Sequence, residues 1–156
     1  MEKYFYQSPI GILEITYENN TVISVKINNI SHIENKENKF TRLIKTELDE
    51  YFDGKRKVFS LPVNPKGTDF QKLVWRKLIK IPCGQTKSYS EIAENIGNKN
   101  AQRAVGSACN KNPVPIIIPC HRVISKSGKT GGYAYGIEIK EELLKIEKGY
   151  CDGGSK

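Results

Sequence analysis

The spacing of apolar residues changes along this chain, and that change limits the folds it can adopt. Residues 11–17 (GILEITY) and 21–27 (TVISVKI) alternate apolar with polar side chains, and turn-forming ENN lies between them, so they predict a β-hairpin. From Phe40 onward, apolar residues mostly recur every three or four positions, which predicts helices. The pattern indicates an α+β protein in which a small sheet precedes mostly helical structure.

The first part of the chain predicts one small α/β unit. Residues 28–39 are polar and predict a loop, and residues 40–52 have helical spacing that Gly54 ends. Residues 57–63 (KVFSLPV) predict a last short strand before an NPKG linker. We therefore expect an N-terminal domain of residues 1–62, a C-terminal domain of residues 63–150 and a flexible tail of residues 151–156.

The C-terminal domain contains two strong helix start signals. Residues 68–71 and 88–91 both have the capping-box pattern, in which a hydroxyl and a Glu or Gln three residues later satisfy free backbone N–H groups. Gly97 ends the second helix, and Asn100 is expected to cap a third, AQRAVGSACN. Two short helices joined by a Gly-containing turn are typical of a helix-turn-helix.

The third helix has one apolar side and one side of small residues. At 100° per residue, the apolar side contains Ala101, Ala104, Val105, Ala108 and Cys109. The other side contains Arg103, Gly106, Ser107 and Asn110. Glycine costs about 1 kcal/mol in a helix, so its presence favours close approach of another surface. That surface is either a neighbouring helix or a ligand.

The net charge of +8 lies entirely in the second part of the chain. Residues 1–62 hold nine Lys/Arg and nine Asp/Glu, whereas residues 63–156 hold sixteen and eight. Positive charge confined to one part favours nucleic acid as a partner over a merely solvated surface. No apolar run is long enough to span a bilayer, and residues 1–11 contain no apolar signal core, so we expect an intracellular protein.

Four cysteines in a chain of this size predict free thiols in a reducing compartment. There is no CxxC pair, and only two histidines occur, so we expect no metal site. Cys83 lies between a helix end and a turn and is expected to be structural. Cys109 lies on an apolar helix face as a small core residue, and Cys151 lies in the tail without a role.

Cys120 has a different setting. Pro113, Pro115 and Pro119 fix the backbone around an apolar run of three isoleucines, and His121 follows the cysteine directly. A thiolate is the nucleophilic form of cysteine, and a nearby histidine can take the thiol proton. Neighbouring residues of a strand point to opposite faces, so this proton transfer would need a water or a bend.

The last helix, residues 137–148, supplies a candidate acid. Glu147 falls in the middle of its apolar face, whereas the other three glutamates of this helix lie on the outer side. A buried carboxylate needs a partner, and His121 and Lys140 are both candidates. A Cys–His–Glu relay is therefore one interpretation of the pattern.

These residues together have a family resemblance. NPVPIIIPCHRVIS resembles the active-site segment of methylated-DNA–protein-cysteine methyltransferases, the O6-alkylguanine-DNA alkyltransferase family. The match extends back through SYSEIA and QRAVGSACNKNP and forward through GGYAYGIEIKEELLKIE, so it covers about residues 68–148. The resemblance implies a ribonuclease-H-like N-terminal domain and a winged-helix-like C-terminal domain that carries the helix-turn-helix.

The resemblance also implies a function. The alkyl group of O6-alkylguanine in double-stranded DNA, and by extension O4-alkylthymine, would move irreversibly to Cys120. His121, through a water, and Glu147 would deprotonate that cysteine, and Tyr89 would promote rotation of the nucleotide and hydrogen-bond the base. Such a protein is a monomer without a cofactor, acts once per molecule, works in the cytoplasm and has no membrane partner.

Further residues take roles from the same resemblance. Arg103 would enter the DNA stack from the recognition helix and replace the flipped base, and the helix would lie in the minor groove. The rest of its predicted DNA surface is Ala101, Gly106 and Ser107.

The resemblance also assigns the residues of the substrate pocket. Asn112 would hold the active-site segment, and backbone groups of Cys120 and Val123 would read the exocyclic amine. Residues 133 and 134 would line the pocket, which Tyr135 would narrow.

Two other functions compete with this one. A thiol hydrolase could use Cys120 and His121, but no oxyanion site is evident in the sequence and such enzymes usually bring the histidine from a distant segment. A helix-turn-helix regulator would need no chemistry. That function leaves unexplained both Glu147 on an apolar helix face and a cysteine with prolines on its N-terminal side.

Some relatives carry a zinc site of Cys and His in the N-terminal domain. Here no cysteine precedes Cys83 and only His32 is available.

Overall fold

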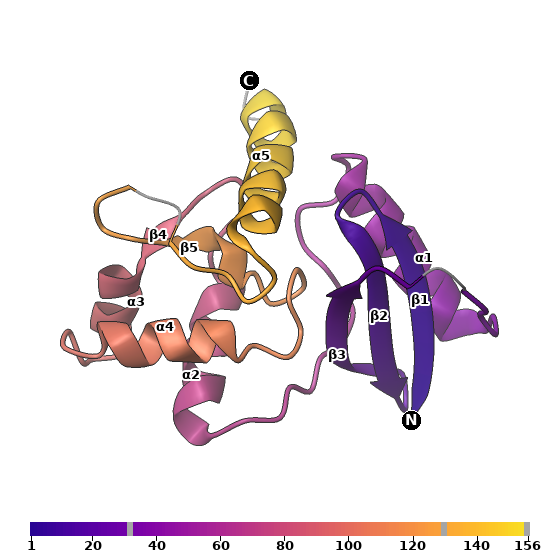
Figure 1. Ribbon diagram of the computed structural model, residues 1–156, viewed down its shortest axis with the longest axis horizontal. Helices are drawn as coiled ribbons and strands as arrows, with labels where there is room; N and C mark the ends of the chain where they lie inside the picture. The colour runs from indigo at the N-terminus through magenta and orange to yellow at the C-terminus, as the bar shows by residue number, and fades with distance from the viewer. Residues whose placement is uncertain (31–32, 129–130, 155–156) are drawn as a thin grey trace.

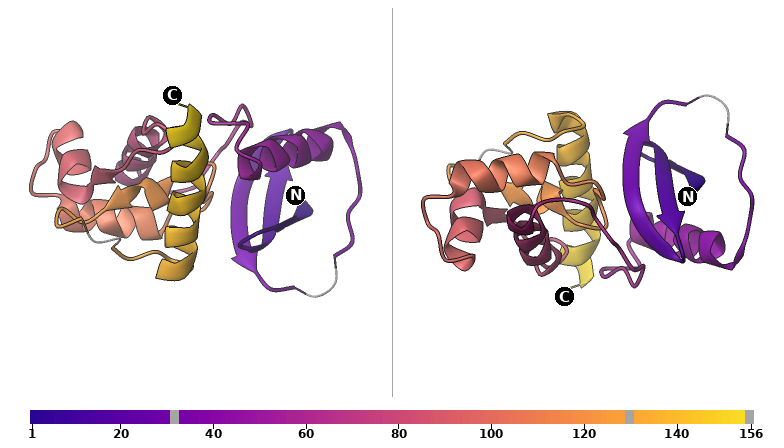
Figure 2. Two further views of the ribbon diagram at one scale, coloured as in Figure 1. Left: turned by 90° about the horizontal axis from the view of Figure 1, so that it is seen from above. Right: turned by 90° about the horizontal axis from the view of Figure 1, so that it is seen from below.

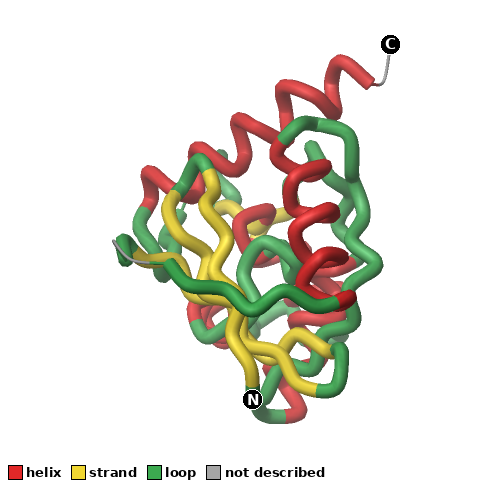
Figure 3. The backbone as a smooth tube through the Cα atoms, turned by 90° about the vertical axis from the view of Figure 1, so that its right-hand side faces the viewer, coloured by secondary structure: helices red, strands yellow, loops and turns green. Residues whose placement is uncertain are grey.

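The computed structural model describes residues 1–30, 33–128 and 131–154. The N-terminal domain is a three-stranded antiparallel sheet in the order β1-β2-β3, with one helix, α1, packed along it (Figures 1 and 3). These elements are β1 Glu2–Ser8, β2 Gly11–Glu18, β3 Thr21–Asn28 and α1 Lys39–Phe52. The predicted α+β class, with the small sheet domain first, is confirmed.

The predicted hairpin is present as β2 and β3. Its turn residues, Asn19 and Asn20, have positive φ values of 51° and 57°. A two-residue turn with both φ values positive matches the twist of the flanking strands, and asparagine tolerates this conformation. The alternating pattern buries Leu13, Ile15 and Tyr17 in the core.

The first strand, β1, was not predicted from the sequence. Tyr4 and Tyr6 occupy alternate buried positions, and the Tyr6 hydroxyl donates to Asp49 Oδ1 of α1 at 2.7 Å. Tyrosine combines an apolar ring with a polar tip, so its alternation with Lys3 and Gln7 gives a weaker strand signal than Ile or Leu would.

The strand predicted for residues 57–63 is wrong. Only Val63 pairs with the sheet, as an isolated parallel bridge to Val22. The Val22 N–H donates to the Pro62 carbonyl at 2.8 Å, and the Asn64 N–H donates to the Val22 carbonyl at 2.9 Å. Pro62 and Pro65 carry no N–H, so this segment cannot extend the ladder along β3.

The C-terminal domain is mostly helical, as predicted. Its elements are α2 Asp69–Ile79, β4 Lys87–Ser88, α3 Tyr89–Asn95, α4 Gln102–Asn110, the 3-10 turn η1 Cys120–Arg122, β5 Val123–Ile124 and α5 Ile137–Gly154. Both capping boxes form, at Thr68 with Gln71 and at Ser88 with Glu91. Helices α3 and α4 form the predicted helix pair beside α2, and the Trp75 indole N–H donates to the Ala108 carbonyl at 2.8 Å (Figure 1).

The start of α4 differs from the prediction. Asn100 does not cap the helix; Ala101 occupies the N-cap position without a side-chain hydrogen bond. Asn98 takes over the local bonding, because its side chain accepts from the Asn100 N–H and its carbonyl accepts from the Ala101 N–H. Ala104, expected on the apolar face, is exposed.

Helix α5 lies on the side of the C-terminal domain that faces the N-terminal domain (Figure 2). Its backbone is helical to Gly154, beyond the expected end at Lys148, so helix covers most of the segment expected as a flexible tail. The side chain of Cys151 lies outside the described residues. Among the described residues, no helix combines the length and apolar character needed to cross a membrane.

Candidate active site

A series of tight turns carries Cys120. The Ile117 N–H donates to the Pro115 carbonyl, the Ile118 N–H to the Val114 carbonyl, and the Cys120 N–H to the Ile118 carbonyl, at 2.8–2.9 Å. The φ of Ile116 is 75°, an uncommon value for a β-branched residue that costs on the order of 1–3 kcal/mol. The surrounding turns therefore hold this segment against local strain.

Asn112 braces the same segment from within. Its side-chain amide donates to the Ile118 carbonyl at 2.8 Å, and its side-chain oxygen accepts from the Val114 N–H at 2.9 Å. Both groups of one buried amide are thus used on the loop that ends at Cys120. This arrangement agrees with the holding role that the sequence predicted for Asn112.

The Cys120 thiol is only 5% exposed. Burial raises its pKa, while a hydrogen bond with Asn112 and the positive charge of Lys140 act in the opposite direction. Burial also raises the pKa of Tyr133 well above its usual value, and the nearby Cys120 adds to this shift. A thiol in this setting gains reactivity from a base that can take its proton.

His121 and Glu147 form a fully buried pair. His121 Nε2 lies 2.6 Å from Glu147 Oε2, and neither residue is exposed. Burial alone would raise the pKa of Glu147, but the charges and hydrogen bonds of His121 and Arg122 hold it well below its usual value. Because the carboxylate is ionised, Nε2 carries a proton and donates, which leaves Nδ1 as the acceptor.

The cysteine and histidine belong to a 3-10 turn, not to a strand. A turn of this kind does not place adjacent side chains on opposite faces, as a strand would. Nδ1 of His121 is buried and has no hydrogen-bond partner among the described residues. The turn therefore combines a buried thiol with an imidazole whose far side is anchored on a carboxylate.

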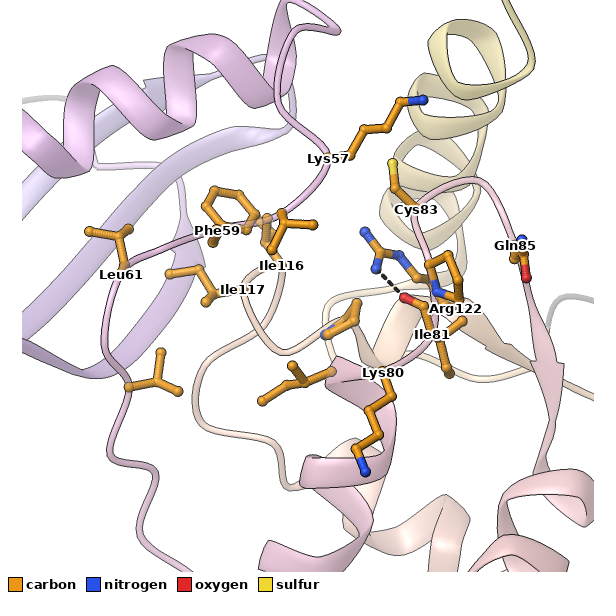
Figure 4. A pocket seen from close by; sticks show the side chains of 15 residues that line it. Lys57, Phe59, Leu61, Lys80, Ile81, Cys83, Gln85, Ile116, Ile117 and Arg122 are labelled. Carbon is orange, nitrogen blue, oxygen red and sulfur yellow. Dashed lines mark hydrogen bonds between the residues drawn. The ribbon is translucent and has the colours of Figure 1, made fainter. Parts of the chain in front are cut away.

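Arg122 was missed as a site residue. Its Nε donates to Glu147 Oε1 at 2.9 Å and its Nη2 to Glu147 Oε2 at 3.0 Å. Its Nη1 donates to the Ile81 carbonyl at 2.7 Å (Figure 4). Arg122 and Ile81 both line a groove of about 600 Å³, together with Cys83 and Lys57. Burial would lower the pKa of Arg122, but the hydrogen bonds and charge of Glu147 raise it. An arginine directly after the histidine was the available sequence signal.

Lys140 does not pair with Glu147, the alternative that the sequence left open. Its buried Nζ donates to the Val123 carbonyl at 2.6 Å and to the Gly132 carbonyl at 3.1 Å, and lies 3.5 Å from the Tyr89 hydroxyl. Burial lowers its pKa. Lys140 thus connects three parts of the predicted site. They are the backbone of Val123, which is predicted to read the exocyclic amine, the loop before α5 at Gly132, and Tyr89, which is predicted to assist rotation of the nucleotide.

Two of the predicted tyrosines lie near this lysine and the thiol, Tyr89 beside Lys140 and Tyr133 beside Cys120. Tyr89 is half-buried, and burial together with the charges of Cys109 and Cys120 raises its pKa to about 12. The rings of Tyr133 and Tyr135 lie 6.1 Å apart, and Ala134 between them is exposed. The Tyr135 hydroxyl lies 3.5 Å from the Val25 carbonyl of β3, so this side chain extends toward the N-terminal sheet.

The predicted DNA surface of α4 is largely open. Arg103 and Ser107 are exposed, whereas Ala101 is buried at the helix start. A Cβ added to Gly106 would lie 3.8 Å from the Tyr89 ring, which is ordinary van der Waals contact. Packing inside the domain therefore does not require glycine at this position.

The described residues contain no group of three His, Cys, Asp or Glu side chains placed to hold a metal ion. His32, the histidine available to the N-terminal domain, lies outside the described residues. Cys109 is buried on α4 and Cys83 is half-exposed, and neither cysteine takes part in a disulfide. Burial raises the pKa of Cys109 to about 12.

Comparison with known proteins places this site in a family. The model of the ribonuclease-like domain of 6-O-methylguanine DNA methyltransferase matches residues 1–65, and that of its DNA binding domain matches residues 69–149. The constitutive methylated-DNA–protein-cysteine methyltransferase of Bacillus subtilis (strain 168) is 41% identical over 152 residues, covering 91% of this chain and 92% of that protein.

Two further likenesses agree. A Methanosarcina mazei protein, also named methylated-DNA–protein-cysteine methyltransferase, is 53% identical over 116 residues, which are 74% of this chain and 72% of that protein. The crystal structure of Mycobacterium tuberculosis OGT in complex with DNA has a TM-score of 0.86 at 39% identity and covers 95% of this chain and 93% of that chain. With both domains matched and the buried Cys–His–Glu arrangement in place, this chain belongs to the family of methylated-DNA–protein-cysteine methyltransferases.

Proposed function

We propose that this protein repairs DNA by transferring the alkyl group of O6-alkylguanine to Sγ of Cys120, once per molecule. The observation that supports this assignment is the buried His121–Glu147 pair, 2.6 Å apart, whose histidine follows the buried Cys120 in the same 3-10 turn. Family membership supports the reaction, and the DNA complex of the Mycobacterium tuberculosis relative supports double-stranded DNA as the partner. The working protein is a monomer without a cofactor, acting inside the cell where its DNA substrate is.

The proposed chemistry is an in-line displacement. His121 Nδ1, through a water, accepts the Cys120 proton while Glu147 stabilises the resulting imidazolium. The sulfur then bonds to the alkyl carbon, the carbon–O6 bond breaks, and its electron pair stays on guanine. The guanine then takes up a proton, and the Tyr89 hydroxyl hydrogen-bonds it as it leaves. The thioether product is stable, so the site is not regenerated.

The alkylated base must leave the helical stack before the sulfur can reach it. We propose that exposed Arg103 occupies the gap and that Gly106 and Ser107 let the α4 backbone approach the minor groove. The basic C-terminal domain supplies contacts that do not depend on sequence. Arg103→Ala is expected to slow repair of duplex DNA more than reaction with free O6-benzylguanine, and equal losses on both substrates would exclude this role.

The decisive test is an intact-mass and peptide-map measurement. The protein is mixed with duplex DNA that carries one O6-methylguanine, and the mass gain, the modified cysteine and the number of lesions repaired per chain are recorded. One methyl group on Cys120, with no more than one lesion repaired per chain, is expected. Lesion binding without methyl transfer would contradict the proposal and favour a protein that only recognises damage.

A further inference from the structure

One hydrogen bond at the catalytic carboxylate comes from the other domain. The Tyr51 hydroxyl, on α1, donates to Glu147 Oε2 at 2.5 Å, and both side chains are completely buried. Residues 51 and 147 belong to the two separately matched domains. Since α5 lies on the face of the C-terminal domain nearest the N-terminal domain, α1 reaches this carboxylate without entering the DNA-binding helices (Figure 2).

Tyr51 is held firmly by its own domain. Its ring lies 5.0 Å from that of Phe52 in an edge-on arrangement and 5.2 Å from that of Phe59 in a tilted one. These contacts fix the ring in the aromatic core between α1 and residues 57–63. The hydroxyl position is therefore set by how the N-terminal domain packs, and it moves with that domain.

The carboxylate that receives this bond is crowded with donors. Oε2 accepts from Tyr51, from Arg122 Nη2 at 3.0 Å and from His121 Nε2 at 2.6 Å, while Oε1 accepts from Arg122 Nε. The charge of Glu147 also acts on Tyr133 in the loop before α5. Tyr51 and Arg122 Nη2 withdraw negative charge from Oε2, the oxygen that faces the imidazole. Each of these two donors therefore limits how strongly Glu147 holds a proton on His121.

We propose that Tyr51 is a positioning residue of the transfer reaction, through which the N-terminal domain sets the strength of the His121–Glu147 pair. This inference rests on the proposed function, because it concerns the base that deprotonates Cys120. It gives the N-terminal domain a direct part in the chemistry, in addition to packing against the C-terminal domain. The bond acts through Glu147, since the Tyr51 hydroxyl donates to that carboxylate.

The test compares two tyrosine variants in the full-length protein. Tyr51→Phe removes the donor to Glu147, whereas Tyr6→Phe removes a similar tyrosine–carboxylate bond, to Asp49, inside the N-terminal domain. Both tyrosines also pack against Phe52, so the two changes are matched in chemistry and surroundings. Transfer to Cys120 from a duplex with O6-methylguanine is measured by mass at a series of pH values.

The expected result is that the acidic limb of the profile of transfer rate against pH shifts for Tyr51→Phe but not for Tyr6→Phe. Without the hydroxyl, Glu147 holds the second proton on His121 more tightly, and a protonated imidazole cannot act as the base. The limb moves to higher pH by about one unit, the size expected for losing one hydrogen bond to a charged group. Transfer is then about tenfold slower below the midpoint and nearly unchanged on the alkaline plateau. A profile that matches Tyr6→Phe, or an equal loss at every pH, would overturn the proposal.

A second comparison tests whether Tyr51 acts through Glu147. In a Glu147→Gln background the charge is gone, so adding Tyr51→Phe is expected to leave the pH profile of that variant unchanged. A further shift in the double variant would show that Tyr51 does not act through Glu147. Wild-type protein that leaves Cys120 unmethylated would instead refute the proposed function, so the two failures are distinguishable.

Discussion

The chain contains the tripeptide Ile-Pro-Cys twice, and the two copies lie next to each other in the fold. The first follows the end of α2 and leaves Cys83 half-exposed on the wall of a groove. The second leads into η1 and leaves Cys120 buried beside a histidine that a carboxylate anchors. Arg122 joins them, because its Nη1 donates to the Ile81 carbonyl of the first copy (Figure 4). Its other two guanidinium nitrogens hold Glu147.

The difference between the copies shows that the tripeptide alone does not make a reactive site. Both turns close in the same way, because the Gln85 N–H donates to the Pro82 carbonyl and the Arg122 N–H to the Pro119 carbonyl. The second turn differs in carrying a histidine, His121, that bonds to Glu147. Cys120 therefore has a base within its own turn. Cys83 has a cation, Arg122, near its thiol but no equivalent base in its turn.

Replacing each cysteine by serine tests the comparison most directly. We expect Cys120→Ser to abolish methyl transfer, because a serine hydroxyl is a far weaker nucleophile than a thiolate, while Cys83→Ser retains the wild-type rate. Methyl transfer to each variant is measured as the gain in protein mass after reaction with an O6-methylguanine duplex. Loss of transfer in Cys83→Ser, with the protein folded, would show that the two copies are not functionally distinct.

Breaking the connection between the copies is expected to give the next largest effect. Arg122→Met leaves the buried carboxylate of Glu147 without its bidentate partner, which costs about 3–5 kcal/mol in the free energy of unfolding. Urea denaturation measures the loss. Lys45→Met removes an exposed ion pair with Asp49 and serves as the control that should unfold like wild type. Similar midpoints for Arg122→Met and wild type would contradict the role given to this arginine.

The turns around the second copy can be weakened separately. Asn112→Ala removes both side-chain bonds that brace the loop, at a cost of about 2 kcal/mol in unfolding free energy, and transfer should slow because the strained backbone at Ile116 loses support. Gln85→Ala, at an exposed position in the first copy, is the matched change and should alter neither quantity. Equal effects from the two substitutions would remove the distinction between a braced turn and a simple one.

The smallest effect concerns acid stability. The pKa of Glu147 is well below its ordinary 4.5 in the folded protein, so its contribution to stability is full above about pH 4.5 and is lost as the pH falls toward the folded value. We expect the unfolding free energy of wild type to fall by about 1.4 kcal/mol more per pH unit below this point than that of Glu147→Gln. Urea titrations between pH 5 and about pH 3 measure these slopes, with Cys83→Ser as a control that follows wild type. Parallel slopes for wild type and Glu147→Gln would show that the folded carboxyl titrates normally.

Local patterns in the sequence predicted much of this protein. Both capping boxes, the β2–β3 hairpin and the helices α1 to α5 follow from spacings of two to four residues, because backbone hydrogen bonds and side-chain periodicity act over that range. The same reasoning placed Glu147 on the buried face of α5 and singled out Cys120 among four thiols. The family resemblance, which rests largely on the PCHRV segment, predicted the alkyl-transfer reaction.

Tertiary structure alone decided which groups meet. The sequence left His121 and Lys140 as the two candidate partners for Glu147, and it did not suggest Arg122 or Tyr51. In the structure His121, Arg122 and Tyr51 all donate to this carboxylate. Tyr51 lies 96 residues from Glu147 in the chain, and the two side chains meet only because the fold brings the end of α1 close to α5. A buried carboxylate must be paired wherever the fold can supply donors, and that supply depends on how distant elements pack, which no short-range pattern records.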